Sequence, residues 1–153
     1  DYGNIEYIVI DGASTDGTLD ILETHTDSID FMSSEPDSGI YEAINKGLEA
    51  AHGEIIAILN SDDRYVNSHV ISEVVKYFQE KNVDAVLSDI EFIENLSVDK
   101  KMRKIKADWF KPWRLRFGWM PPHPGMFLRS SVYEKHGFYS VDYEIAADYE
   151  FVA

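Results

Sequence analysis

The chain has 153 residues, enough for one domain, and 44% of them are apolar, so it can bury a core. Its 28 acidic and 14 basic residues give a formal net charge of −14, which disfavours nucleic acid as a partner because phosphate backbones bind Lys and Arg. The absence of cysteine excludes disulfides, thiolate-bound metals and cysteine nucleophiles.

The predicted elements alternate between strands and helices. Continuous apolar runs indicate strands covered on both faces, and apolar residues at helical spacing indicate amphipathic helices. In chain order these are a strand at 5–10, a helix from 15 or 16 to 25, a strand at 30–34, a helix at 39–51, a strand at 55–59, a helix at 68–81 and a strand at 84–88. The alternation predicts an α/β fold whose mainly parallel sheet is flanked by helices.

Charge is distributed unevenly along the chain. Residues 100–119 carry eight basic residues and one acid, a net charge of +7, and contain all three tryptophans. The rest of the chain has a net charge of −21. This segment indicates a surface for anionic head groups or an amphiphilic substrate. The alternative is a loop whose aromatic rings pack against the protein while its charges stay solvated.

Polar side chains follow three of the predicted strands. Asp11 follows the first strand, Asn60, Asp62 and Asp63 follow the strand at 55–59, and Asp89 follows the last. Ligands of such sheets bind at the carboxyl ends of strands. Oxygen ligands without cysteine indicate Mg²⁺ or Mn²⁺, which would suit a diphosphate-bearing substrate. Alternatively, residues 60–62 simply form a turn.

Three further features each allow two interpretations. Residues 37–39 precede the helix at 39–51 and either cap it or bind phosphate at its N-terminus. Asn45 is a poor helix former, so it needs a compensating role, such as a contact with a nucleotide. His123 lies between prolines and has either a structural role or, as neutral imidazole, a role in binding a metal or diphosphate.

Five blocks, in the expected order, resemble family 2 glycosyltransferases with the GT-A fold. They are the strand and D-G-x-S-T-D-G-T loop of 5–18, the A-x-N-x-G helix of 41–47, the D-x-D-D site of 59–63, the F-x-R stretch of 125–138 and the E-D-x-E motif of 147–150. The subtype resembles bacterial transferases that build surface polysaccharides. The resemblance implies one catalytic domain over 1–153 that lacks the first strand and helix and the C-terminal end of the family's fold.

The resemblance implies roles for individual residues. Asp11 matches the position that recognises the base or ribose of the nucleotide. Asp62 matches the metal and diphosphate position, with Asp63 beside it, and Asn60 stands where the family has the first Asp of D-x-D. Asp148 matches the general base.

Two of these matches depart from the family's pattern. Asn60 can accept a hydrogen bond from a ribose hydroxyl but brings no charge to a metal. Ala147 replaces the Glu that precedes the general base, which removes one like charge beside Asp148.

The implied function is inverting transfer of a sugar from a nucleotide-diphosphate sugar, with a UDP-sugar favoured, to a glycan or lipid-linked acceptor in polysaccharide synthesis. Asn45 is a candidate contact to the nucleotide, and His123 joins Asp62 as a candidate ligand of Mg²⁺ or Mn²⁺. We expect a cytoplasmic protein, in contact with the inner face of a membrane if residues 100–119 bind lipid.

Two other classes remain as alternatives. A nucleotidyltransferase would want a glycine-rich loop with Lys or Arg near its first strand to hold a triphosphate, and the sequence has no such loop there. A non-catalytic domain that binds nucleotide or carbohydrate would keep the fold without the reaction.

Overall fold

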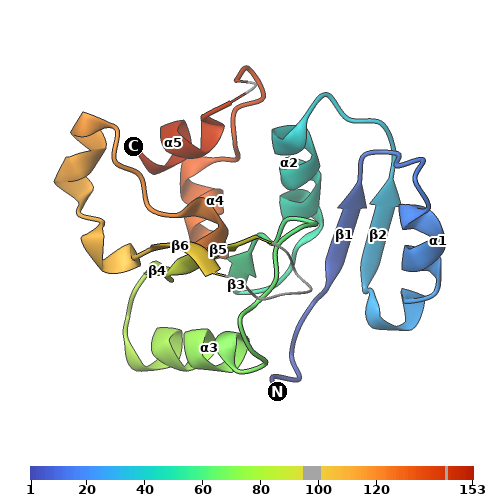
Figure 1. Ribbon diagram of the computed structural model, residues 1–153, viewed down its shortest axis with the longest axis horizontal. Coiled ribbons are helices and arrows are strands. Elements are labelled where there is room, and N and C mark those ends of the chain that lie inside the picture. Colours follow the sequence, from blue (N-terminus) through green and yellow to red (C-terminus); the bar gives the residue numbers. More distant parts are fainter. Residues whose placement is uncertain (95–100, 144) are drawn as a thin grey trace. The chain divides into compact units, whose positions relative to one another are not determined.

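The computed structural model describes residues 1–94, 101–143 and 145–153 (Figure 1). By its internal contacts the chain divides into two compact units. One contains residues 2–54 and 130–151, and the other contains residues 55–129 together with residues 1, 152 and 153.

The first unit is built on a parallel strand pair. Its elements are β1 (Ile8–Asp11), α1 (Thr18–Glu23), a 3₁₀ turn (Thr26–Ser28), β2 (Phe31–Ser34), α2 (Ile40–Ala50), α4 (Ser130–His136) and α5 (Ala147–Val152). The parallel register places Ile8 opposite Phe31 and Asp11 opposite Ser34. Helix α2 packs against β1, with Gly47 close to the Ile10 side chain. The two strands therefore end side by side, at Asp11 and Ser34.

An aromatic cluster forms the other half of this unit. Tyr133 of α4 and Tyr139, which follows α4, are both buried, and each ring contacts that of Phe151 in α5, at centroid distances of 5.2 and 4.8 Å. Tyr41 of α2 stacks on Tyr139 at 5.9 Å. Since α2 also packs on β1, the same helix connects the strand pair with the aromatic cluster.

The second unit contains a three-stranded sheet and a hairpin. Its elements are β3 (Ile55–Ala57), α3 (Val70–Glu80), β4 (Ala85–Leu87), β5 (Ile90–Ile93), β6 (Lys101–Ile105), 3₁₀ turns at Ala107–Trp109, Pro112–Phe117 and His123–Gly125, and β7 (Met126–Arg129). Strand order in the sheet is β3-β7-β4, and β5 pairs with β6 in a separate antiparallel ladder.

The α/β class is confirmed, with one difference in how the strands pair. Strand β7 lies between β3 and β4 and pairs antiparallel with both. Because both neighbours oppose β7, β3 and β4 run in the same direction, as expected, but they do not pair with each other. The described ladders are thus only partly parallel. Periodicity predicts strands but not the insertion of β7, whose partners in β4 lie 39 to 43 residues earlier, because such pairing depends on long-range packing.

Two of the strands are less covered than their apolar runs predict. Strand β1 begins at Ile8, and Ile5 and Tyr7 before it are about half exposed. Strand β3 ends at Ala57, and Leu59 is exposed. Burial on both faces is therefore wrong for Ile5, Tyr7 and Leu59, which lie outside the paired segments.

The core of the second unit surrounds β7. Val74 and Phe78 of α3 pack with Phe127 of β7, and all three are buried. Tyr65 stacks on Phe127 at 6.2 Å. The core therefore fixes the middle strand of the sheet to α3.

Candidate active site

Asp11 lies at the end of β1 and is 7% exposed. Its Oδ2 accepts hydrogen bonds from Ser34 Oγ at 2.6 Å and from the Ser14 N–H at 3.0 Å. Hydrogen bonding from the Ser14 side chain first, then from the Ser34 hydroxyl, and further from the Ser14 N–H, lowers the pKa of the Asp11 carboxyl below its ordinary value. Asp11 is consequently a fixed, ionised acceptor at the strand end. Sequence reasoning missed Ser34, although a parallel register between β1 and β2 would have placed it opposite Asp11.

The loop after Asp11 has a strained backbone. Ala13 adopts a left-handed conformation, with φ of 63°. For a residue with a side chain this costs of order 1–3 kcal/mol, and such residues gather at functional sites. A Cβ added to Gly12 would lie 2.7 Å from Asp37 Oδ2, so a side chain at this position would require the Asp37 carboxylate to move.

Asp148 lies in the first turn of α5 and is half-buried. Its Oδ1 accepts a hydrogen bond from the Tyr149 N–H at 2.8 Å and one from the Tyr41 hydroxyl of α2 at 3.3 Å. Tyr41 was not among the expected site residues, because no local pattern connects positions 107 residues apart. Both bonds are made to Oδ1 and hold the half-buried carboxylate in one orientation.

The chain enters α5 through a second strained residue. Ala146, two residues before Asp148, has φ of 77°. Among the described residues, Ala13 and Ala146 are the two non-glycine positions with a left-handed backbone. Each lies two residues from a carboxylate that the sequence singles out, which agrees with a functional role for both loops.

Asn45 clamps the backbone of Tyr139. Its Nδ2 donates to the Tyr139 carbonyl at 2.8 Å, and its Oδ1 accepts from the Tyr139 N–H at 3.0 Å. This is the compensating role that a helical Asn requires, and it needs no ligand. The nucleotide contact of Asn45 stays a prediction. Burial raises the pKa of the Tyr139 hydroxyl, so this ring remains neutral beside Asp148.

We expect Asn45→Ala to lower the free energy of unfolding by about 1–3 kcal/mol, because the buried Tyr139 N–H and C=O lose their partner. Glu49→Ala, at an exposed position on the same helix, is the control and should change stability by about 0.5 kcal/mol or less. Urea denaturation measures both. A stability equal to that of the unaltered protein, together with a loss of nucleotide affinity, would instead assign Asn45 to the ligand.

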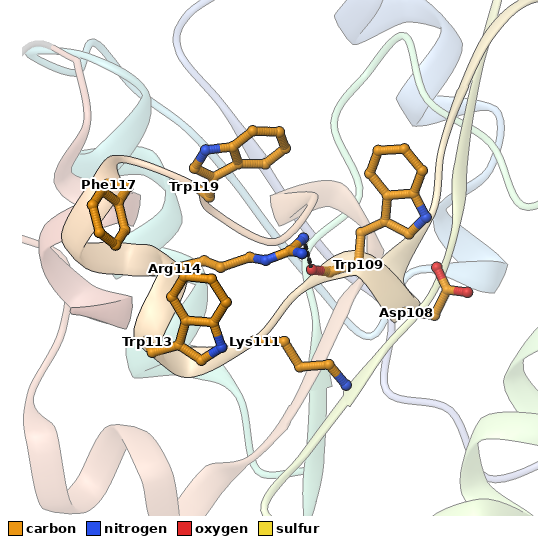
Figure 2. A pocket seen from close by; sticks show the side chains of 7 residues that line it. All are labelled: Asp108, Trp109, Lys111, Trp113, Arg114, Phe117 and Trp119. Carbon is orange, nitrogen blue, oxygen red and sulfur yellow. Dashed lines mark hydrogen bonds between the residues drawn. The ribbon is translucent and has the colours of Figure 1, made fainter.

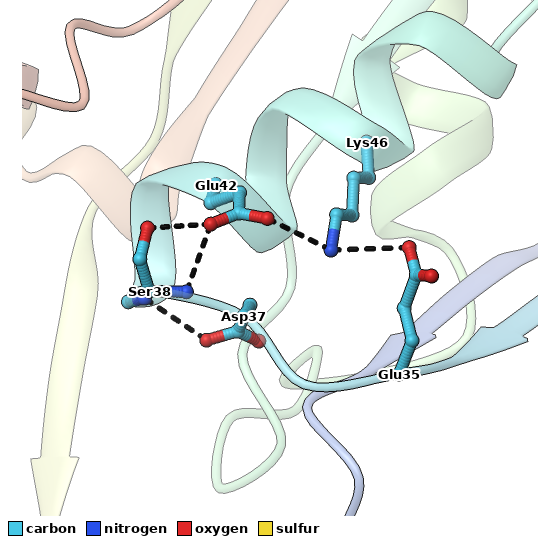
Figure 3. A network of polar contacts seen from close by, with 6 residues as sticks. Glu35, Asp37, Ser38, Glu42 and Lys46 are labelled. Atoms are coloured by element: carbon cyan, nitrogen blue, oxygen red, sulfur yellow. Dashed lines mark hydrogen bonds and ion pairs between the residues drawn. The ribbon is translucent and has the colours of Figure 1, made fainter.

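A network of polar contacts surrounds the N-terminus of α2 (Figure 3). Glu42 accepts hydrogen bonds from the Ser38 N–H, at 2.8 Å, and from the Ser38 hydroxyl, and Asp37 Oδ1 accepts from the Gly39 N–H at 3.0 Å. Lys46 bridges Glu42 at 3.0 Å and Glu35 at 3.1 Å.

These contacts bear on the two interpretations of residues 37–39. The Ser38 hydroxyl, with Lys46 second, lowers the pKa of Glu42 to about 2. Glu42 and Asp37 accept from the N–H groups of Ser38 and Gly39, which precede the helix, and Gly39 at the N-cap offers no side chain to the helical N–H groups. Capping and phosphate binding at this N-terminus therefore both stay predictions.

Residues 60–63 form a turn after β3. Asn60 Nδ2 donates to Asp63 Oδ2 at 3.0 Å, and the Asp63 N–H donates to the Asn60 carbonyl at the same distance. Asp62, between them, is exposed. The prediction that residues 60–62 form a turn is therefore confirmed. In this turn the Asp62 side chain is exposed, while the Asp63 carboxylate is hydrogen-bonded to Asn60.

The fourth strand-end carboxylate is neutralised by the protein itself. Asp89 accepts from the Ala107 N–H at 2.9 Å and pairs with Lys104 at 2.9 Å. The Ala107 bond, with Lys104 second, lowers the pKa of Asp89. Asp89 thereby ties the end of β4 to β6.

His123 lies in the 3₁₀ turn before β7 and is half-buried. The turn is anchored because the Ser88 N–H donates to the Gly125 carbonyl at 2.8 Å. A Cβ on Gly125 would lie 2.6 Å from the Ser88 carbonyl oxygen, which requires glycine at this position.

The described residues contain no group of three or more His, Asp or Glu that could hold a metal ion. Mg²⁺ is commonly bound by one or two carboxylates, with water and substrate phosphates completing its shell. The adjacent carboxylates of Asp62 and Asp63 fit that kind of site and not a closed protein cage.

The predicted site residues fall into two sets. Asp11, Asn45 and Asp148 belong to the first unit, and Asn60, Asp62, Asp63 and His123 belong to the second. Within the first set, α2 supplies both the clamp on Tyr139 and the tyrosine bonded to Asp148.

An α/β fold with carboxylates at its strand ends defines a class of proteins that bind ligands at that edge of the sheet, and sequence comparison identifies the family. Residues 1–140 match the sequence model described as Glycosyl transferase family 2, so the chain belongs to this family. An uncharacterized glycosyltransferase of Mycobacterium tuberculosis is 33% identical over 150 residues, which cover 98% of this chain and 56% of the relative. A PGL/p-HBAD biosynthesis glycosyltransferase of Mycobacterium bovis is 28% identical over 156 residues, covering 97% and 57%. The chain thus spans about half the length of these relatives.

Solved structures share the fold. TarS of S. aureus, residues 1–349 in complex with UDP, superposes with a TM-score of 0.75 at 23% identity, over 96% of this chain and 44% of that 1–349 chain. The mannosyltransferase PcManGT of Pyrobaculum calidifontis, in complex with GDP-Man and Mn²⁺, has a TM-score of 0.65 at 22% identity, over 95% and 41%. These likenesses establish the GT-A fold. None of the helices in the described residues has the length and apolar character needed to span a bilayer.

Proposed function

We propose that the protein is an inverting glycosyltransferase that moves a sugar from a nucleotide-diphosphate sugar to an acceptor hydroxyl. The observation that carries the proposal is the half-buried Asp148 carboxylate, oriented by Tyr41 on a strained lead-in to α5. Family membership supplies the reaction class, and the resemblance at Ala147–Glu150 supplies the role of general base.

In the proposed reaction the acceptor oxygen attacks the anomeric carbon while the bond from that carbon to the diphosphate oxygen breaks. The nucleoside diphosphate leaves with the electron pair, and Asp148 takes the proton of the attacking hydroxyl. A single displacement from the face opposite the leaving group inverts the anomeric centre. Tyr41 holds the Asp148 carboxylate in position for this transfer.

Asp11 binds the donor in this proposal. Its fixed, ionised carboxylate accepts a hydrogen bond from the base or ribose, and its Ser14 and Ser34 bonds hold it in one orientation. Asn60 offers a neutral acceptor, and Asn45 is a further candidate contact. The solved relatives contain UDP in one case and GDP-Man in another, and we favour a UDP-sugar as donor.

Asp62, with Asp63 and His123 as additional candidates, would hold a divalent ion, Mg²⁺ or Mn²⁺. When bound, such an ion neutralises negative charge that develops on the diphosphate. The exposure of Asp62 leaves its carboxylate open to an ion that arrives with the nucleotide.

We expect UDP at a hundred times its dissociation constant, with Mn²⁺ present, to raise the melting temperature by about 5–10 °C, because ligand binding to the native state adds about 2.7 kcal/mol. Asp62→Asn should remove most of the Mn²⁺-dependent part of this shift, whereas Asp27→Asn, at an exposed position in the 3₁₀ turn before β2, should leave it intact. The measurement is a thermal melt with UDP and with GDP, each with and without Mn²⁺. A melting temperature that no nucleotide changes would contradict the proposal.

A further inference from the structure

Residues 108–119 form an open hollow with aromatic walls, shown in Figure 2. Its volume is about 650 Å³, enough for one or two sugar rings. The residues that line it are Asp108, Trp109, Lys111, Trp113, Arg114, Phe117 and Trp119. All of them belong to one continuous segment of the second unit, so the segment builds the hollow by itself.

Arg114 occupies the centre of the hollow. Its guanidinium lies 5.4 Å from the centroid of the Trp113 ring and 5.8 Å from that of Trp119, and Nη1 donates to the Trp109 carbonyl at 2.6 Å (Figure 2). A guanidinium has five N–H donors, and the other four make no hydrogen bond to the described part of the chain. A half-buried cation with spare donors is therefore held between two indoles.

The rings around Arg114 are open to solvent. The three indoles are 56–61% exposed, although large aromatic side chains are ordinarily well covered in a folded protein. Lys111 adds a second positive charge to the lining, against the single carboxylate of Asp108 at the edge beside Trp109. The hollow combines exposed ring faces with a net positive charge.

We propose that this hollow binds an acidic sugar residue of a carbohydrate acceptor. The apolar face of a pyranose ring packs on an indole, and a carboxylate or phosphate on the same sugar receives two parallel hydrogen bonds from Arg114. Lys111 adds attraction for the same anion. That the carbohydrate is the acceptor rests on the proposed glycosyl transfer; binding of the acidic sugar does not.

The charge and tryptophan content of residues 100–119 would also suit a lipid bilayer as the ligand. The geometry of the hollow favours a sugar. Indoles that insert into a bilayer would carry the Arg114 guanidinium between them toward the hydrocarbon, where a charged group is costly. The rings instead converge around the cation, as the walls of a pocket do. Lys100, the first residue of that segment, lies outside the described residues.

Tryptophan fluorescence tests the proposal directly, because all three tryptophans of the chain line the hollow. The protein is titrated with trigalacturonate and, separately, with the neutral trisaccharide maltotriose. We expect a saturable change in emission with trigalacturonate and an affinity for maltotriose at least about tenfold weaker, since one charge-assisted pair is lost. Isothermal calorimetry with UDP, run in parallel, reports the donor site independently.

Two substitutions locate the binding site. Arg114→Lys keeps the charge but loses the planar donor pair, and should weaken trigalacturonate binding about tenfold. Lys111→Gln, at an exposed position that cannot disturb packing, should weaken it by a smaller factor. Lys76→Gln, an exposed lysine on α3, is the matched control and should leave the affinity unchanged.

Several outcomes would overturn the proposal. These are equal affinities for the acidic and neutral trisaccharides, no response to either, or the same response to sodium acetate at matched concentration. Vesicles containing phosphatidylglycerol that shift the emission when trigalacturonate does not would assign the surface to a bilayer instead. Binding of UDP without binding of trigalacturonate would refute only the proposal that the hollow binds an acidic sugar. Binding of trigalacturonate without binding of UDP would refute the proposed donor site and leave the proposal for the hollow intact.

Discussion

Replacing Asp148 by Asn is expected to lower the rate of sugar transfer by about 10²–10⁴-fold, the usual contribution of a general base. Asn is nearly the same size and its Oδ1 can still accept from the Tyr149 N–H and the Tyr41 hydroxyl, so the local structure should persist. The amide cannot take the proton of an acceptor hydroxyl. Binding of UDP should be unchanged, which separates loss of the base from loss of the fold.

Glu150→Gln is the control for this prediction. Glu150 lies on the same helix and is exposed, so removing its charge should alter transfer by less than about twofold. Initial rates of transfer and the dissociation constant of UDP are measured for both variants. If Asp148→Asn transfers sugar at the rate of the unaltered protein, Asp148 is not the base.

Phe127→Ala is expected to lower the free energy of unfolding by about 3–5 kcal/mol, because it removes a large side chain from the core and leaves a cavity. Phe127 is 3% exposed, packs with Val74 and Phe78, and stacks on Tyr65. It also lies in the strand that joins β3 to β4. Loss of its contacts should therefore weaken the whole second unit.

Phe92→Ala, in the neighbouring hairpin, is the comparison. Phe92 is 48% exposed, so its replacement should lower the free energy of unfolding by less than about half of the amount expected for Phe127→Ala. Denaturation by guanidinium chloride measures both variants. Equal losses would show that β7 is not the centre of the core.

Much of the local structure follows from the sequence because it depends on neighbouring residues. The apolar spacing at 39–51 and 68–81 predicts α2 and α3, which form at Ile40–Ala50 and Val70–Glu80. The turn residues at 60–63 likewise predict the hydrogen-bonded turn that follows β3. Periodicity and turn chemistry act within a few residues, so the elements that they specify can be predicted without knowledge of the tertiary fold.

Sequence reasoning could not foresee contacts between distant segments. Asn45 hydrogen-bonds the backbone of Tyr139, which lies 94 residues later in the chain, and the Tyr41 hydroxyl hydrogen-bonds Asp148, which lies 107 residues later. Asn45 drew attention as an unexpected residue in a helix, but the partner that explains it is a backbone peptide with no distinguishing side chain. Motif resemblance named Asp148 and Asp11, while the tyrosine and serine that orient them carry no such signal.

By itself, the sequence determined the α/β class, the family, the main helices and the carboxylates that the proposed reaction uses, because these depend on local spacing and on motifs. Only the tertiary structure decided that β7 separates β3 from β4, that Asp89 is already paired with Lys104, and that the tryptophans gather around Arg114. These three features depend on which segments pack together at the lowest free energy. Such packing joins residues that no periodic pattern in the sequence connects.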